Sequence, residues 1–285
     1  MNVFTHELTK RLRLLYSEED LKFLYEWLYS KQTDVAESAA EMNKALGLSG
    51  ETLLKPDLSC LSVGSLKGLV ILAANPGWSE KANALEDAFC KTSSEQYIDI
   101  LLNFFKTHPK VVGERVRWWS GPIGFYNELY DERSKFTAIT SIEKWNAVSE
   151  ERMLGGWELF PWHSSKDGIS AQIHKTPWLH ELAKESICAL LRVNPKAILV
   201  ASKAGYDLIR HDLLKDIYWL DSTIGDNARI AISYSILDSG TEIIAIQRQI
   251  FASFKVVKNK EIYAKIRGLR ERYVDSSNCI KKYNN

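Results

Sequence analysis

The segment that most constrains the fold is residues 69–79, LVILAANPGWS. The first six are apolar and four of them are Leu, Val or Ile, which is typical of a strand covered on both faces, as in a parallel sheet. Asn-Pro-Gly then ends the strand, because proline lacks an N–H and glycine adopts backbone conformations closed to other residues. The pattern predicts that Asn75 lies at the carboxyl end of a buried strand, where open α/β sheets bind ligands. It also fits an ordinary strand-to-loop transition.

Further apolar strands alternate with amphipathic helices along most of the chain. We expect strands over residues 156–161, 197–201, 229–234 and 241–246. We expect helices over residues 79–108, 125–130, 176–191 and 262–273, after two or three helices over residues 6–48. This alternation predicts a three-layer α/β fold, a central mostly parallel sheet flanked by helices. Residues 1–55 form an N-terminal helical extension in this interpretation, and residues 56–285 form the α/β domain.

Several helix starts can be placed from single residues. Thr176 is the expected cap of its helix, with Pro177 at the first helical position. Ser202 follows the strand that ends at Ala201, and the small residues after Lys203 open the next helix. Unpaired N–H groups at such a start favour an anion, so this strand end is predicted to contact phosphate.

Composition narrows the class of protein. In 285 residues, 45% are hydrophobic, which is enough for a sizeable core, and no apolar run approaches the roughly 20 residues that cross a bilayer. The first residues lack the pattern of a signal peptide, so we expect a cytoplasmic protein without a membrane partner. The four cysteines are scattered and His174 lies six residues from His180, so neither a metal site nor a cofactor is expected.

Charge is balanced overall but not along the chain. The formal net charge is +1, whereas residues 255–285 hold nine basic and three acidic residues. Such a segment either contacts phosphates or forms a solvated helix face. P-loop, dinucleotide-binding and serine-hydrolase motifs are all absent from the sequence, so those chemistries lack support.

The predicted strand-end loops combine aromatic rings, amide and carboxylate groups, and cationic donors. Their members are Asn75, Trp78, Trp119, Glu158, His163, Ser202 and Arg248. Stacking faces, hydrogen-bonding groups and phosphate donors are what an enzyme needs to turn a nucleotide into a pocket.

The order of motifs resembles the uracil-DNA glycosylase superfamily. Residues 73–77, AANPG, are similar to its first motif, a buried strand ending in Gly-x-Asn/Asp/Glu-Pro-Gly/Tyr, and are closest to the mismatch-specific branch, which uses asparagine. Residues 119–129 resemble the Phe-x-Gly-x-x-Gly-x-x-Leu segment, whose leading aromatic stacks on the extruded base. Residues 158–162 match the central strand that reads the base edge, and residues 195–208 match a later strand-to-helix segment. The similarity spans roughly residues 64–275.

The resemblance implies a monofunctional DNA glycosylase that hydrolyses the bond between base and deoxyribose and leaves an abasic site. Asn75 would be catalytic, holding a water against C1′, and no cofactor or metal would take part. The implied base pocket consists of Pro76, Gly77, Trp78, Trp119, Glu158 and His163. The implied DNA contacts are Ser79, Ser164, Ser202, Lys203, Arg248, Gln249, Ile250 and Phe251, where Ile250 or Phe251 fills the vacated stack. DNA would be the partner of a monomer.

Departures from the family pattern keep alternatives open. The family's closing His-Pro-Ser is replaced by residues 247–251, QRQIF, and about forty residues separate Gly77 from Trp119. These differences favour a base other than plain uracil, such as a bulkier modified base of phage DNA in an antiviral role. Two other functions fit the sequence: a non-catalytic DNA-binding protein, and a doubly wound enzyme that acts on a small nucleoside or phosphorylated ligand.

Overall fold

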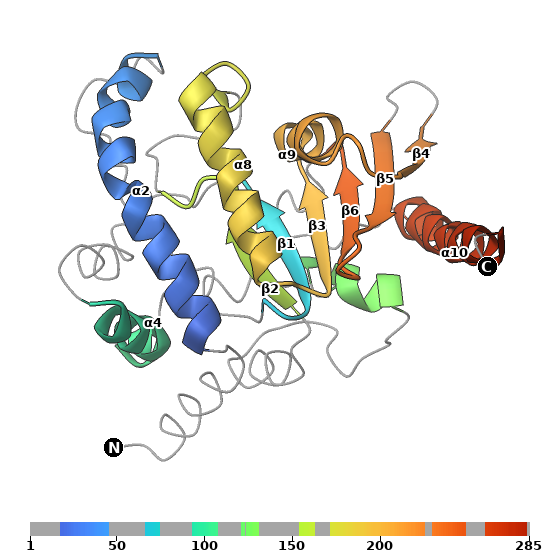
Figure 1. Ribbon diagram of the computed structural model, residues 1–285, viewed down its shortest axis with the longest axis horizontal. Helices are drawn as coiled ribbons and strands as arrows, with labels where there is room; N and C mark the ends of the chain where they lie inside the picture. The colour runs from blue at the N-terminus through green and yellow to red at the C-terminus, as the bar shows by residue number, and fades with distance from the viewer. Residues whose placement is uncertain are drawn as a thin grey trace.

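A computed structural model of the chain shows an α/β architecture with a mixed six-stranded sheet (Figure 1). The strands are β1 (Leu69–Ala73), β2 (Leu154–Glu158), β3 (Ala197–Ala201), β4 (Leu220–Ile224), β5 (Ile230–Ile236) and β6 (Glu242–Ile246). The structure describes residues 18–45, 66–74, 93–107, 121–122, 124–130, 154–162, 172–225, 230–248 and 260–283.

The strand order is β2-β1-β3-β6-β5-β4. β2, β1, β3 and β6 run parallel, whereas β5 is antiparallel to β6 and β4 is antiparallel to β5. The prediction of a mostly parallel sheet therefore holds for four of the six strands, whereas the edge formed by β5 and β4 is antiparallel. The antiparallel pairing of β5 with β6 follows from the short connection between them. A tight turn at residues 237–241, where Gly240 has φ 86°, joins the two strands, whereas parallel strands need a much longer crossover.

The helices mostly follow the expected ranges. They are α2 (Glu18–Ala45), α4 (Ser94–Thr107), α8 (Pro177–Arg192), α9 (Lys203–Asp207) with its π-helical continuation η3 (Leu208–Leu213), and α10 (Lys260–Tyr283), together with a helical stretch at residues 124–130. α2 is one continuous helix over 28 residues. Residues 79–92 of the helix predicted over residues 79–108 lie outside the described residues.

Aromatic packing joins α2 to the strand edge at β2. The Trp27 ring centroid lies 6.0 Å from that of Trp157 and 6.2 Å from that of Trp162. The Trp162 indole N–H also donates to Gln32 Oε1 over 2.8 Å. Figure 1 shows α2 beside α8, next to the β2 and β1 half of the sheet. The boundary predicted at residue 55 lies outside the described residues, so the division into an extension and a domain stays a prediction.

α10 packs against β5 and β4 at the other end of the sheet (Figure 1). The Arg270 guanidinium forms a 2.8 Å ion pair with Glu242 and lies 4.7 Å from the centroid of the Tyr130 ring. The Tyr273 hydroxyl donates to the carbonyl oxygen of Ile236. For the basic residues of this segment the sequence left two alternatives open, a contact with phosphate and a solvated helix face. Arg270 is one of these residues, and its contacts anchor α10 to the sheet.

Candidate functional site

Four parallel strands end at the same edge of the sheet, and β1 lies at the point where the strand order reverses. β1 is followed along the chain by β2, which lies on one side of it, whereas β3 is followed by β4, which lies on the other side of the sheet. In open α/β sheets a crevice for ligands lies outside the carboxyl ends of the strands at such a switch point. That point is between the ends of β1 and β3, at Ala73 and Ala201 (Figure 1). We call this the carboxyl edge.

β2 stays paired with β1 beyond the last residues of both strands. The backbone N–H of Leu159 donates to the carbonyl oxygen of Ala73 over 2.9 Å, and the N–H of Phe160 donates to that of Ala74 over 3.0 Å. The two segments therefore leave the sheet side by side as far as Ala74 and Phe160.

Glu158 ends β2 and is held in place from α8. The Ser186 hydroxyl donates to the carbonyl oxygen of Glu158 over 2.7 Å and accepts a 2.9 Å hydrogen bond from the Trp157 indole N–H. Ser186 and Trp157 are fully buried. Oε2 of the Glu158 side chain is also shielded from solvent. We call the contacts among Trp157, Ser186 and Glu158 the β2 clamp.

Ser202 and Lys203 lie at the end of β3. Ser202 caps α9, since its hydroxyl oxygen accepts a 3.1 Å hydrogen bond from the backbone N–H of Gly205, which confirms the predicted helix start. Gly205 has no room for a side chain, because a Cβ would lie 2.6 Å from Cγ1 of Val200. The Lys203 side chain is exposed. This close packing fixes the chain where β3 turns into α9.

Arg248 lies two residues beyond β6 and its side chain is exposed. The hydrogen bond from the Gln247 N–H to the carbonyl oxygen of Ala231 fixes the preceding residue. Neighbouring strands are about 4.8 Å apart, so three spacings separate the ends of β2 and β6 by about 14 Å. The carboxyl edge thus has a carboxylate, Glu158, at one side and two cations, Lys203 and Arg248, at the other.

The remaining residues predicted for the site lie outside the described residues. They are Asn75, Pro76, Gly77, Trp78, Ser79, Trp119, His163, Ser164, Gln249, Ile250 and Phe251. Asn75 follows Ala74 directly in the chain. Of the predicted site, the structure describes Glu158, Ser202, Lys203 and Arg248, and it brings them to one edge.

Sequence reasoning missed a second polar cluster, between α8 and η3. Nε2 of His180 lies 2.5 Å from Oδ2 of Asp212, and Nζ of Lys184 lies 3.8 Å from the same oxygen. The His174 ring centroid is 5.7 Å from that of His180. The two partners of the short contact are 32 positions apart, so no local spacing signals it. In the part of the chain that the structure describes, no cluster of ligating side chains suits a metal ion.

Asp221 on β4 belongs to another polar network that the sequence did not reveal. Burial raises the pKa of this carboxyl, but hydrogen bonds from Arg210 and Ser233 outweigh that effect and hold the pKa below its usual range. The Ser233 hydroxyl is in turn 2.8 Å from that of buried Tyr206. The network joins η3 and α9 to β4 and β5 and keeps Asp221 ionised near neutral pH.

No protein-family model matches the chain, and no curated protein is significantly similar to it. Among the described helices, none is both long and apolar enough to cross a membrane.

Proposed function

We propose that the chain is a DNA glycosylase that turns a modified base out of DNA and hydrolyses its N-glycosidic bond at the carboxyl edge. One observation carries the proposal: β1 lies between β2 and β3 at the switch point, and the Asn-Pro-Gly sequence begins two residues after Ala73, the last residue of β1. The motif that resembles the glycosylases is therefore attached to the strand end where this topology favours a ligand.

The described residues at this edge suit the partners of such a reaction. Glu158, held by the β2 clamp, would accept hydrogen bonds from the edge of the extruded base. Lys203 and Arg248, both exposed, would bind backbone phosphates. Acid at one side and cations at the other match a substrate with a hydrogen-bonding base and an anionic backbone.

Asn75 would act by position and electrostatics. An amide is a poor general base, so its contribution is to hold a water molecule against C1′ while the sugar gains positive charge. The DNA phosphates and the polarised base share that charge. The product is an abasic site, because the proposed mechanism includes no amine nucleophile.

An abasic-site assay tests the proposal. The protein is incubated with DNAs that carry uracil, mismatched thymine, hydroxymethylcytosine or glucosylated cytosine, and alkali then breaks the strand at abasic sites. We expect breaks with at least one substrate and none with Asn75→Ala, whose DNA binding stays near that of the wild type. Lys203→Ala and Arg248→Ala should weaken binding and its salt dependence, whereas Lys215→Ala, at an exposed lysine after η3, serves as the matched control.

The outcomes separate the three functions. Salt-dependent DNA binding without breaks on the whole panel identifies a non-catalytic DNA-binding protein. Binding of a free nucleoside without binding of DNA identifies an enzyme of small ligands. Breaks that persist in Asn75→Ala would remove this residue from the mechanism.

A further inference from the structure

β4 is the last strand of the sheet and lies beside β5 (Figure 1). In the part of the chain that the structure describes, β5 pairs with one side of β4 and no strand pairs with the other side. Backbone N–H and C=O groups along such a side can bind another extended chain. We call this side of β4 the open edge.

The hydrogen bonds of β5 show which residues of β4 face the open edge. Ala231 of β5 bonds toward β6, because its carbonyl oxygen accepts a 3.0 Å hydrogen bond from the chain just beyond β6. Alternate residues of a strand direct their backbone groups to opposite sides, so Ile232 bonds toward β4. Its partner in the register is Ser222. The backbone groups of Asp221 and Thr223, the neighbours of Ser222, therefore point away from β5.

Elements on both faces of the sheet hold this end of it in place. On one face, Arg210 of η3 forms a 3.0 Å ion pair with Asp221, which is the one charged residue of β4. On the other face, the ring of Tyr273 from α10 lies 5.6 Å from that of Tyr234 on β5. The charge of β4 is therefore compensated within the chain and does not by itself repel a second strand.

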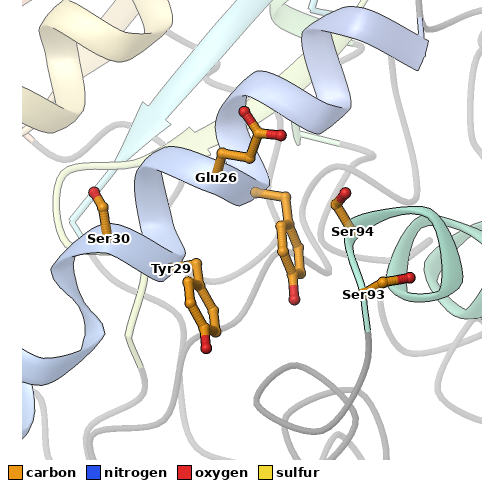
Figure 2. Close-up of a pocket in the computed structure, with 6 residues that line it drawn as sticks. Glu26, Tyr29, Ser30, Ser93 and Ser94 are labelled. Atoms are coloured by element: carbon orange, nitrogen blue, oxygen red, sulfur yellow. The ribbon is translucent and has the colours of Figure 1, made fainter.

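Exposed apolar side chains gather near the open edge. Among the described residues, the large ones are Tyr29, Tyr218 and Val274. Tyr29 lines a separate cavity of about 340 Å³ between α2 and α4 (Figure 2). Tyr218 precedes β4 by two residues, and its ring centroid lies 5.6 Å from that of Tyr273, the neighbour of Val274. Two of the three exposed apolar residues thus lie at the β4 end of the sheet, where a partner would cover them.

The sequence of β4 is self-complementary in an antiparallel pair. When Ser222 of one copy lies opposite Ser222 of another, Asp221 of each copy lies opposite Thr223 of the other. These two residues carry the outward N–H and C=O groups, so the two pairs form four hydrogen bonds. Leu220 then lies opposite Ile224, an apolar pair on one face. No like charges lie directly opposite each other, and the ion pair with η3 compensates both carboxylates.

We propose that the open edge binds a second copy of this chain, so that the two six-stranded sheets become continuous in a two-fold dimer. The resemblance to the glycosylases implied a monomer instead. Because the two copies of β4 run antiparallel, the carboxyl edges of the two sheets face opposite directions. Dimerisation therefore leaves both carboxyl edges open, and the proposal does not depend on the glycosylase activity.

Sedimentation velocity on the full chain, over a series of protein concentrations, measures the association. One pair of short strands is a small interface, so we expect a reversible dimer whose fraction grows with concentration. Thr223→Pro removes an outward N–H from each copy and with it two of the four hydrogen bonds, which should weaken the dimer about tenfold or more. Proline is tolerated where the N–H points away from the sheet, so circular dichroism should show an unchanged fold.

Charge at the same position tests which residues lie opposite each other. Thr223→Asp places a carboxylate opposite Asp221 of the other copy, whereas Thr223→Lys places an ammonium there. Both substitutions put a charged side chain at the same exposed position. Because each contact occurs twice in the dimer, the lysine variant should associate about tenfold more tightly than the aspartate variant. Equal association of the two variants would overturn the proposal.

Disulfide formation locates the two-fold axis. The Cα atoms of the two opposite Ser222 residues would be about 4.5 Å apart, within reach of a disulfide, whereas those of the two Thr223 residues would be about 8 Å apart. Ser222→Cys should therefore cross-link two copies on mild oxidation, and the control Thr223→Cys should not, as identified by mass spectrometry of the linked peptides. A chain that is monomeric at every concentration, a dimer unaffected by Thr223→Pro, or no cross-link through residue 222 would overturn the proposal.

Discussion

Replacing Ser186 with alanine removes the hydroxyl group from the β2 clamp. The variant loses the hydrogen bond to the carbonyl oxygen of Glu158 and one of the two that the Trp157 indole N–H makes. The indole keeps its 3.0 Å hydrogen bond to the carbonyl oxygen of residue 186. The carbonyl oxygen of Glu158 is therefore the acceptor that loses a donor. An unsatisfied buried polar group costs about 1–3 kcal/mol, and we expect the free energy of unfolding of Ser186→Ala to fall by that amount.

Urea unfolding followed by tryptophan fluorescence measures this loss. The midpoint should decrease and the m-value should stay constant, because the surface exposed on unfolding is the same. Ser222→Ala, at a half-buried position of the edge strand β4, is the control and should change stability by less than about 0.5 kcal/mol. A Ser186→Ala variant as stable as this control would refute the claim that the clamp stabilises the end of β2.

Three further perturbations test the packing around the carboxyl edge and α10. Gly205→Ala should lower the melting temperature, since its Cβ would lie 2.6 Å from Cγ1 of Val200 and overpacking costs about 1–3 kcal/mol; an unchanged melting temperature would contradict this geometry. Arg270→Ala should lower the free energy of unfolding by about 1–3 kcal/mol, less than the loss of a partner from a fully buried ion pair. In a double-mutant cycle, adding Glu242→Ala should recover part of this loss, and additive effects of the two substitutions would exclude coupling between the residues. Burial, and then the charge of Glu242, raises the pKa of Tyr234 to about 12, so its contribution to stability is complete below pH 10 and is lost as the pH rises to 12. Melting temperatures from pH 9 to 12 should fall less steeply for Tyr234→Phe than for the wild type, and equal slopes would contradict the assignment.

The strands that the sequence predicted best are those with the simplest physical signal. β1 and β3 are continuous apolar runs whose residues are almost all buried, as is typical of strands in a covered parallel sheet, and their bounds follow the runs closely. β4 was missed because Asp221, Ser222 and Thr223 fill its centre and its burial alternates, as at a sheet edge. Periodicity does not show strand direction, but the six residues between the strands predicted at 229–234 and 241–246 are too few for a parallel crossover, so the length of this connection indicates an antiparallel pair.

Helix continuity and contacts between residues far apart in the chain also limited what could be predicted from the sequence. Residues 18–45 form the single helix α2, because neither glycine nor proline interrupts Glu18–Ala45. The rest of the range 6–48, over which two or three helices were expected, lies outside the described residues. For the site, the ends of β2, β3 and β6 meet at one edge as predicted, since parallel strands share an end. The contact between His180 and Asp212 needed the fold itself, because it depends on how η3 lies against α8.

Release of the free base under single-turnover conditions tests the central claim most directly. DNAs with uracil, mismatched thymine and modified cytosines are mixed with excess protein, and the freed base is quantified by mass spectrometry. We predict release of one base class in equal yield with abasic sites, and a rate at least about a hundredfold lower for Asn75→Ala, the effect expected when a positioned water is lost. No free base from any substrate, or an equal rate in the variant, would contradict a glycosylase centred on Asn75 at the carboxyl edge.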